Sequence, residues 1–563
     1  MTRLGLPDPE GLSLAAQVAQ LITVRASGFL FDHQRRYPQW ELNTADLRHC
    51  VEKLGIGGVI LLGGSAVEVG VRSQQLQSWA EISLLLAADI EEGVGQRFAG
   101  ATHFPPPMAL AAIAEHDLAL ACDYAQQMGA VTAQEATAIG LNWILAPVVD
   151  VNNNVDNPVI NVRAFGDTPD VVGKLSQAFI RGAQQLPLLT TAKHFPGHGD
   201  TAVDSHLQLP VIPHDYQRLD QVELAPFRTA IASGVDAVMT AHLQVPAIDP
   251  QLPATLSPAI LTRLLRQDLG FDGLVVTDAL IMGAITNQYG PYEAAVLAIE
   301  AGADILLMPA DPAGTIEAVC EAVRTRRVAP ERILMSVERV WRAKQKVSSG
   351  LAIPPESCHA WEHVPPPPVQ LEALATPTAR QTLAQILQAS TQRRGQIAPL
   401  LAATTGQSLV IVDDVLNTDW LSPQAPAIAR PAQRGYATQL VDPQICPVPV
   451  ESLVASEQRT LLQIFSRGNP FRGTAGLSDY ARQCFDQLNA HQLLAGLVVY
   501  GSPYVFEQLM GELSATVPYG FTYSQTPEGQ AVVLHQLFAT SSVQPSGQGA
   551  FTDQPSGQGA FTD

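Results

Sequence analysis

The chain has little positive charge and few cysteines, and each shortage excludes a class of protein. Its 563 residues include 33 lysines and arginines against 53 aspartates and glutamates, which gives a formal net charge of −20. Because nucleic-acid binding requires a basic face, we expect no nucleic-acid partner. The 6 cysteines are scattered without a CxxC pair, which argues against a disulfide framework and against a cysteine-ligated zinc site.

Long apolar runs are also lacking. No stretch approaches the roughly 20 consecutive apolar residues that a membrane span requires, so no membrane partner is expected. The first residues, MTRLGLPDPEGLSLAAQ, are interrupted by prolines and lack the continuous apolar core of a secretory signal. The sequence therefore predicts a cytoplasmic protein.

Short apolar runs alternate with longer amphipathic segments over residues 1–350. The short runs do not alternate with polar residues, which is typical of strands that are buried on both faces. Eight strand–helix units predict an α/β fold with an N-terminal (β/α)8 TIM-type barrel. The expected strands are residues 21–24, 57–62, 84–90, 143–149, 190–195, 238–243, 274–278 and 305–308.

The remainder of the chain predicts three further parts. Residues 351–370 are rich in proline and indicate a stiff linker. Residues 371–540 return to α/β character and predict a smaller α/β sandwich domain, with strands at 408–412 and 497–500. Residues 541–563 contain QPSGQGAFTD twice in tandem, and this composition cannot build a core, so we expect a disordered C-terminal tail.

Polar residues lie at the C-terminal ends of five of the expected barrel strands. Enzymes with this fold place their catalytic groups at the carboxyl ends of the strands, because the loops that follow the strands form one rim. The coincidence at five separate strands predicts an active site at that rim. The residues are Asp89 with Glu91, Asp150, His194, His242 and Asp278.

The densest group of ionisable residues is KHFPGHGDTAVDSH at 193–206. Glycines on both sides of His198 indicate a backbone that residues with a Cβ cannot adopt. The residues alone allow a metal site, a proton-transfer histidine, or a loop in which these groups serve only as braces. Pro196 and Gly197 keep His194 and His198 from sharing one helical face, which weakens the metal interpretation.

The order of five motifs resembles glycoside hydrolase family 3, and within it the bacterial β-N-acetylhexosaminidase branch in its two-domain form. The resemblance covers residues 15–345, and the Asp-Ser-His element at the end of the loop distinguishes this branch from the family's β-glucosidases. The second domain resembles the α/β sandwich of two-domain members. The motifs lie at residues 89–98, 161–166, 193–206, 239–242 and 275–282.

The resemblance implies a retaining exo-β-N-acetylglucosaminidase that removes terminal GlcNAc, with peptidoglycan fragments as its substrate and with no cofactor or metal. Asp278 is the implied nucleophile, which would form a covalent glycosyl-enzyme. His206 is the implied general acid/base, and Asp204 is implied to orient its ring. A histidine suits this step because its ordinary pKa is near neutral and a carboxylate neighbour favours the protonated form.

The resemblance also implies a set of residues that bind the sugar. A carboxylate can accept hydrogen bonds from two hydroxyl groups, and basic side chains supply donors. One member of the set, Arg97, could instead be a salt-bridge partner outside the contact with sugar. The set is Asp89, Arg97, Arg163, Lys193 and His194.

The sequence departs from the family pattern at three positions. Glu92 replaces a glycine of the first motif, and Thr277 and Ala279 replace a serine and an aspartate around Asp278.

Three other functions are kept open. Phosphorolysis is one, because a histidine repels phosphate less than a carboxylate does. The others are a β-glucosidase of the same family and a sugar-binding protein without turnover.

Overall fold

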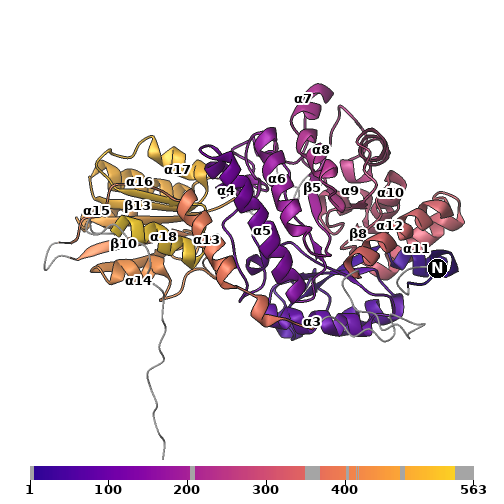
Figure 1. The fold of residues 1–563 in the computed structure, drawn as a ribbon. Helices are drawn as coiled ribbons and strands as arrows, with labels where there is room; N and C mark the ends of the chain where they lie inside the picture. Colours follow the sequence, from indigo (N-terminus) through magenta and orange to yellow (C-terminus); the bar gives the residue numbers. More distant parts are fainter. Residues whose placement is uncertain are drawn as a thin grey trace, which may run out of the picture.

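Two α/β units lie side by side in the computed structural model, which describes residues 6–202, 209–348, 368–400, 405–413, 415, 418–468 and 476–538 (Figure 1). The first unit extends from the N-terminus to α12 and the second from α13 to α18. The proposed linker at 351–370, apart from its last three residues, and the tail at 541–563 lie outside the described residues.

The first domain is built on eight parallel strands, one at each expected position. Their side chains are almost all buried, because helices cover the outer face of the sheet and packed side chains fill the inside, which explains the continuous apolar runs. The strands are β1 (Ile22–Ser27), β2 (Gly58–Leu62), β3 (Leu85–Ala88), β4 (Trp143–Ile144), β5 (Thr191–Phe195), β6 (Ala237–Thr240), β7 (Leu274–Val276) and β8 (Leu306–Leu307).

The eight strands form a curled parallel sheet in two arcs, with the orders β4-β3-β2-β1-β8 and β5-β6-β7. Isolated parallel bridges stand where the arcs meet, Val148 with Lys193 between β4 and β5, and Val276 with Ile305 between β7 and β8. The predicted α/β fold with two domains is confirmed. The closed (β/α)8 barrel stays a prediction, because the continuous strand ladders stop at both of these seams.

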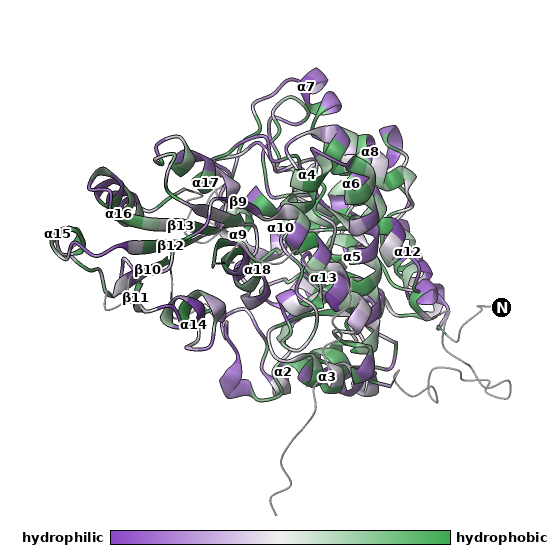
Figure 2. Ribbon diagram, turned by 60° about the vertical axis from the view of Figure 1, so that its left-hand side comes forward, coloured by the Kyte–Doolittle hydropathy of each residue, from purple (hydrophilic) through white to green (hydrophobic). Residues whose placement is uncertain are grey.

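Amphipathic helices cover the outside of the curled sheet, and Figure 2 shows hydrophilic and hydrophobic residues alternating along α5 and α12. Side chains cap the starts of several of them, for example Ser65 for α3 and Asp117 for α5. None of the helices in the described part of the chain is long and apolar enough to span a membrane. The helices are α1 (Leu14–Ala19), α2 (Thr44–His49), α3 (Ala66–Trp79), α4 (Met108–Ala114), α5 (Leu118–Ala138), α6 (Pro169–Ala183), α7 (Tyr216–Gln221), α8 (Leu224–Ala232), α9 (Gly283–Tyr289), α10 (Pro291–Ala301), α11 (Pro312–Arg324) and α12 (Pro330–Ser348).

The second domain contains a six-stranded sheet with the order β11-β10-β12-β13-β14-β9, in which only β9 is antiparallel. Helices lie on both faces, and each face has its own apolar core, as an α/β sandwich requires. The strands are β9 (Gln392–Arg394), β10 (Gly406–Val412), β11 (Tyr436–Val441), β12 (Thr460–Ser466), β13 (Leu494–Gly501) and β14 (Tyr519–Thr522). The helices are α13 (Pro377–Ser390), α14 (Pro426–Ala432), α15 (Val450–Ala455), α16 (Asp479–Ala490), α17 (Pro503–Met510) and α18 (Pro527–Phe538).

Candidate active site

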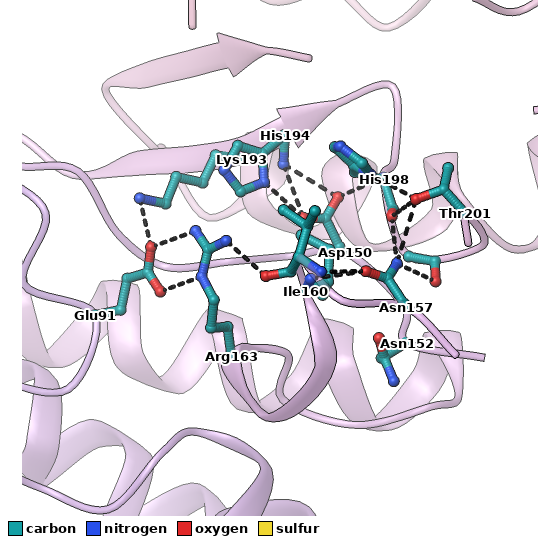
Figure 3. Close-up of polar contacts among 12 residues, drawn as sticks. Glu91, Asp150, Asn152, Asn157, Ile160, Arg163, Lys193, His194, His198 and Thr201 are labelled. Atoms are coloured by element: carbon teal, nitrogen blue, oxygen red, sulfur yellow. Dashed lines mark hydrogen bonds and ion pairs between the residues drawn. The ribbon is translucent and has the colours of Figure 1, made fainter. Parts of the chain in front are cut away.

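Two acidic and two basic side chains meet where β3 and β5 end. Lys193 Nζ lies 2.7 Å from Asp89 Oδ1 and 2.6 Å from Glu91 Oε1. Arg163 donates to both oxygens of Glu91 at 2.8 Å, so Glu91 lies between the two bases, as Figure 3 shows. Asp89 and Glu91 are two positions apart just beyond a strand, where alternate side chains point to the same side. We call these four residues the rim cluster.

The rim cluster is charged although most of it is buried. The side chains of Lys193 and Glu91 are 1% and 3% exposed, whereas that of Asp89 is 33% exposed. Burial opposes ionisation of Glu91, but Arg163 and Lys193 outweigh it and hold the pKa of this carboxyl well below its usual value. Burial likewise opposes the charge on Lys193, and Asp89 and Glu91 raise the pKa of the ammonium group above its usual value. The cluster is therefore a set of neutralised ion pairs with Asp89 as its exposed end.

Asp150 fixes the start of the 193–206 segment. Its carboxylate accepts from the backbone N–H of His198 at 2.7 Å and from that of His194 at 3.1 and 3.2 Å, and it lies 2.8 Å from His194 Nδ1. Burial favours the protonated acid, but His194 and His198 hold the pKa of Asp150 below its usual value. Since the carboxylate accepts from Nδ1, Nε2 is the ring atom of His194 that Asp150 does not use.

His198 lies deeper in the same loop. Its Nδ1 atom is 2.9 Å from Thr201 Oγ1, and Asn157 donates to the carbonyl oxygens of residues 198 and 199 at 2.9 and 2.8 Å. Burial lowers the pKa of His198 to about 4, although Asp150 opposes this shift. His198 is therefore neutral near pH 7 and braces the loop, together with the groups drawn in Figure 3.

The two glycines beside His198 have the conformational role that the sequence predicts. Gly197 has a φ of 130°, in the region that favours glycine. A Cβ on Gly199 would lie 1.7 Å from the carbonyl oxygen of Val151. The backbone at these two positions therefore excludes any larger residue.

Asp278 lies just beyond the end of β7, at the same edge of the sheet as the rim cluster. The strand register pairs Lys193 with Met239 and Met239 with Val276, which places residues 193 and 276 at one level and Asp278 above them. The negative charge of Asp278 also acts on His198, where it opposes the lowering of the pKa by burial. The structure thus brings Asp278 to the loop that follows β5.

The chain around Asp278 is held by buried polar groups. Asp278 Oδ1 accepts from the backbone N–H of Ala279 at 2.7 Å. His242 is fully buried, with its Nε2 atom 3.1 Å from the carbonyl oxygen of Ala279 and its Nδ1 atom 2.8 Å from Thr255 Oγ1. Because a carbonyl oxygen can only accept, Nε2 carries the hydrogen, and His242 fixes the carbonyl group of Ala279, the residue after Asp278.

The geometry of the remaining predicted residues varies. Arg97 Nε donates to the backbone carbonyl oxygen of Asp89 at 2.9 Å, so it supports the main chain beneath the rim cluster. Asp204 and His206 lie outside the described residues. The sequence interpretation omitted Glu91 from the sugar-binding set, although its position two residues after Asp89 was a usable signal. It also omitted Asn157, whose contacts cross 41 and 42 positions of the chain and leave no local pattern.

One described group of side chains has the types and spacing of a metal site, namely Asp200, His214 and Glu223. His214 Nε2 lies 2.7 Å from Asp200 Oδ2. Arg218 donates to Glu223 at 2.9 Å and lies 3.7 Å from Asp200. A guanidinium group thus already contacts both carboxylates, and we interpret these side chains as a polar network with ion pairs.

The fold and the rim define a two-domain α/β protein with a polar site at the carboxyl ends of its parallel strands. Residues 13–343 match the Glycosyl hydrolase family 3 N terminal domain, and residues 400–539 match the Bacterial Glycosyl hydrolase family 3 C-terminal domain. The chain belongs to glycosyl hydrolase family 3, which confirms the resemblance found in the sequence.

The chain is also similar to individual proteins. The chain is 35% identical to Beta-hexosaminidase A of Pseudoalteromonas piscicida over 344 residues, 55% of this chain and 57% of the relative. It is 32% identical to a Beta-N-acetylglucosaminidase/beta-glucosidase of Cellulomonas fimi over 308 residues, 53% of this chain and 54% of the relative. The matched parts thus span little more than half the length of these two relatives. A solved β-N-acetylglucosaminidase of the family from Paenibacillus sp. str. FPU-7 is 30% identical, covers 94% of this chain and 97% of its own, and superimposes with a TM-score of 0.76.

Proposed function

We propose that this protein is an exo-β-N-acetylglucosaminidase that hydrolyses terminal β-linked GlcNAc with retention of configuration. The observation that carries the proposal is that the rim cluster and Asp278 lie at the same edge of the parallel sheet. It agrees with the family and with the β-N-acetylglucosaminidase from Paenibacillus, which aligns over 94% of this chain. The isolated bridges at both seams support a (β/α)8 barrel as the scaffold.

In this proposal the rim cluster binds an uncharged sugar. Its charges cancel within the cluster, so a neutral ligand causes no unbalanced burial of charge. Asp89 is its exposed end and can accept hydrogen bonds from two hydroxyl groups. Lys193 directs two of its three N–H bonds at Asp89 and Glu91, and the third can serve a sugar oxygen. Arg163 and His194 complete the contact, and Arg97 supports the backbone of Asp89.

Asp278 is the proposed nucleophile. One of its oxygens bonds to the anomeric carbon while the bond from that carbon to the glycosidic oxygen breaks. His206 donates the proton that the departing oxygen takes up, and Asp204 stabilises its protonated ring. Water then gives a proton to His206 and attacks the anomeric carbon, which releases GlcNAc and restores Asp278. The braced segment at 198–201 lies just before Asp204 and His206 in the sequence.

The natural substrate and the compartment follow from the same proposal. We infer that the GlcNAc comes from peptidoglycan fragments in cell-wall turnover, and that the reaction takes place in the cytoplasm. A carbohydrate partner is implied by the family.

The first experiment measures release of an aryl group from aryl β-GlcNAc and aryl β-glucoside. We expect the β-GlcNAc compound to react faster, and Asp278→Ala to lose activity by a factor of at least about 10⁴, since nucleophile loss removes the covalent pathway. A faster reaction with the glucoside would make the protein a β-glucosidase. Unchanged activity of Asp278→Ala would contradict the proposed nucleophile.

The second experiment separates the reaction products. Hydrolysis yields free GlcNAc, which NMR should first detect as the β anomer if configuration is retained. Formation of GlcNAc 1-phosphate at millimolar phosphate would instead identify a phosphorylase. His206→Ala should slow substrates with poor leaving groups most, because these need protonation. Equal losses for good and poor leaving groups would contradict the acid/base role of His206.

A further inference from the structure

The second domain contacts the first at Glu92, the residue next to the rim cluster. Arg467, just beyond the end of β12, forms an ion pair with the Glu92 carboxylate, with Nη1 at 3.2 Å from Oε2. His103 Nε2 lies 3.1 Å from the same carboxylate. The ring of Trp420 in the second domain packs edge-on against His103, with centroids 5.2 Å apart. Residues from both domains therefore surround one carboxylate.

Glu92 is a buried charge that depends on these partners. Its side chain is 1% exposed, while that of Arg467 is 28% exposed. Burial favours the neutral acid, but Arg467 and His103 lower the pKa of Glu92 to about 2. The carboxylate is therefore ionised at neutral pH, and Arg467 supplies its permanent counter-charge, because a guanidinium stays protonated.

A second contact reaches the loop that carries Arg163. Tyr504, in α17, lies with its hydroxyl 2.7 Å from Asn152 Nδ2. Asn152 in turn accepts from the backbone N–H of Asn161, two positions before Arg163, at 2.8 Å. A Cβ on Gly468 of the second domain would lie 3.1 Å from Asn161 Cβ, so the two backbones are closely packed there.

Apolar packing joins the same surfaces. One of the cores of the second domain extends into Met108 and Ala109 of α4 and into Val162, and Figure 1 shows α17 beside α4. The second domain thus touches the loops after β3 and β4, which supply Glu91 and Arg163.

We propose that Arg467 is a positioning residue for the sugar site, and that it acts through Glu92. The main chain at residues 91 and 92 is held from two sides, by Arg163 and Lys193 through Glu91 and by Arg467 through Glu92. Without Arg467, the Glu92 carboxylate has lost its permanent counter-charge, and turning toward water lowers its free energy. That movement displaces Glu91 and Asp89. The second domain is therefore a functional part of the site, which rests on the proposed sugar-binding role of the rim cluster.

The test compares Arg467→Met, Arg467→Lys and the double variant Glu92→Gln/Arg467→Met by steady-state kinetics on the aryl glycoside that the wild-type enzyme cleaves fastest. Arg467→Met should raise KM and the inhibition constant of the free sugar by about tenfold or more, since it misplaces groups that bind substrate. We expect kcat for a good leaving group to change by less than about threefold, because Asp278 lies on another loop.

Rescue separates positioning from general damage. Arg467→Lys should restore most of the affinity, because an ammonium group also balances the carboxylate. The double variant should bind sugar better than Arg467→Met alone, since a neutral amide needs no counter-charge. Asp419→Asn is the matched control, because Asp419 forms an exposed interdomain ion pair with Arg36 at 3.0 Å, and its kinetics should match the wild type.

Either of two results would overturn the proposal. The first is that Arg467→Met has the KM and the inhibition constant of the wild type. The second is that the double variant binds sugar as weakly as Arg467→Met. If Arg467→Met does not fold, as judged by thermal unfolding, the comparison of Arg467→Lys and the double variant with wild type decides the matter in the same way. The proposed activity is judged separately, because it depends on what the wild-type enzyme cleaves, whereas this proposal depends on the ratio of variant to wild type.

Discussion

Two networks of buried charges lie at opposite edges of the same curled sheet, and they differ in charge balance and exposure. The rim cluster, where β3 and β5 end, pairs two acids with two bases and exposes Asp89. At the other edge Asp304, which precedes β8, is fully buried and contacts Arg266, Arg332 and Arg339. A balanced network with one exposed acid suits ligand binding, whereas the closed network around Asp304 joins the sheet to α12.

At the edge around Asp304, which we call the lower edge, burial and the neighbouring positive charges both act on Arg266. Burial lowers the pKa of Arg266 to about 10, and Arg339 and Arg332 add to this shift although Asp304 opposes it. Asp304 therefore holds together three cations that otherwise repel one another. We therefore propose that the edge around Asp304 contributes stability and that the rim binds substrate, in line with the general division between the two faces of such folds.

The largest expected effect is on stability at the lower edge. Asp304→Ala removes the buried carboxylate that three partly buried arginines share, although Arg339 keeps an ion pair with the exposed Asp272 at 3.6 Å. We expect the free energy of unfolding to fall by about 3–5 kcal/mol. Denaturant titration measures this loss. The kcat of the fraction that remains folded should equal that of the wild type. A loss of kcat in that fraction would show that the edge around Asp304 also serves activity.

A change at the rim should act mainly on activity. Glu91→Gln removes the carboxylate that Lys193 and Arg163 share, and we expect kcat/KM to fall by about 100-fold, equivalent to about 2.7 kcal/mol. The matched control is Glu68→Gln, which changes the capping box at the start of α3. It should leave kcat/KM unchanged, and an equal loss in both variants would show that the effect of Glu91→Gln is not specific to the rim.

Lys344 in α12 is a third case of a buried charge, which can be compared with the two networks. Within the described residues this fully buried ammonium group has no carboxylate partner, and it donates to Gln20 at 2.6 Å. Burial lowers its pKa to about 7. Between about pH 7 and its ordinary pKa of about 10.4 the unfolded chain binds the proton and the folded chain does not, so stability should rise with pH across this window.

Lys344→Met removes a destabilising buried amine, and we expect the free energy of unfolding at pH 7 to be about 1–3 kcal/mol higher than in the wild type. The rise in stability above pH 7 should also become shallower in this variant. Chemical denaturation at a series of pH values measures both effects. An unchanged slope would show that Lys344 does not keep its lowered pKa in solution.

The sequence predicts features that are encoded locally. The eight apolar runs became strands, and Gly197 and Gly199 have the constrained backbone that their positions beside His198 indicate. Each of these signals lies within a few residues, where hydrophobic pattern and backbone sterics are sufficient.

The sequence could not predict contacts that depend on folding. Asp150 holds residues that are 44 and 48 positions away, and its position at the end of an expected strand did not indicate these partners. Glu92 was only a departure from the family pattern until the fold placed Arg467 beside it, 375 positions later. Such pairs are set by the packing of whole elements and leave no periodic trace in the chain.

Trapping of a glycosyl-enzyme would show whether Asp278 attacks the anomeric carbon of a sugar that the rim cluster binds. The enzyme would be treated with a 5-fluoro β-GlcNAc donor, which slows hydrolysis of a glycosyl-enzyme, and then digested for mass spectrometry. If Asp278 is the nucleophile, we expect one added fluorosugar on the peptide that contains Asp278, and none in Asp278→Ala. A label on Asp89, Glu91 or another carboxylate, or turnover of the donor with no labelled peptide, would contradict that role.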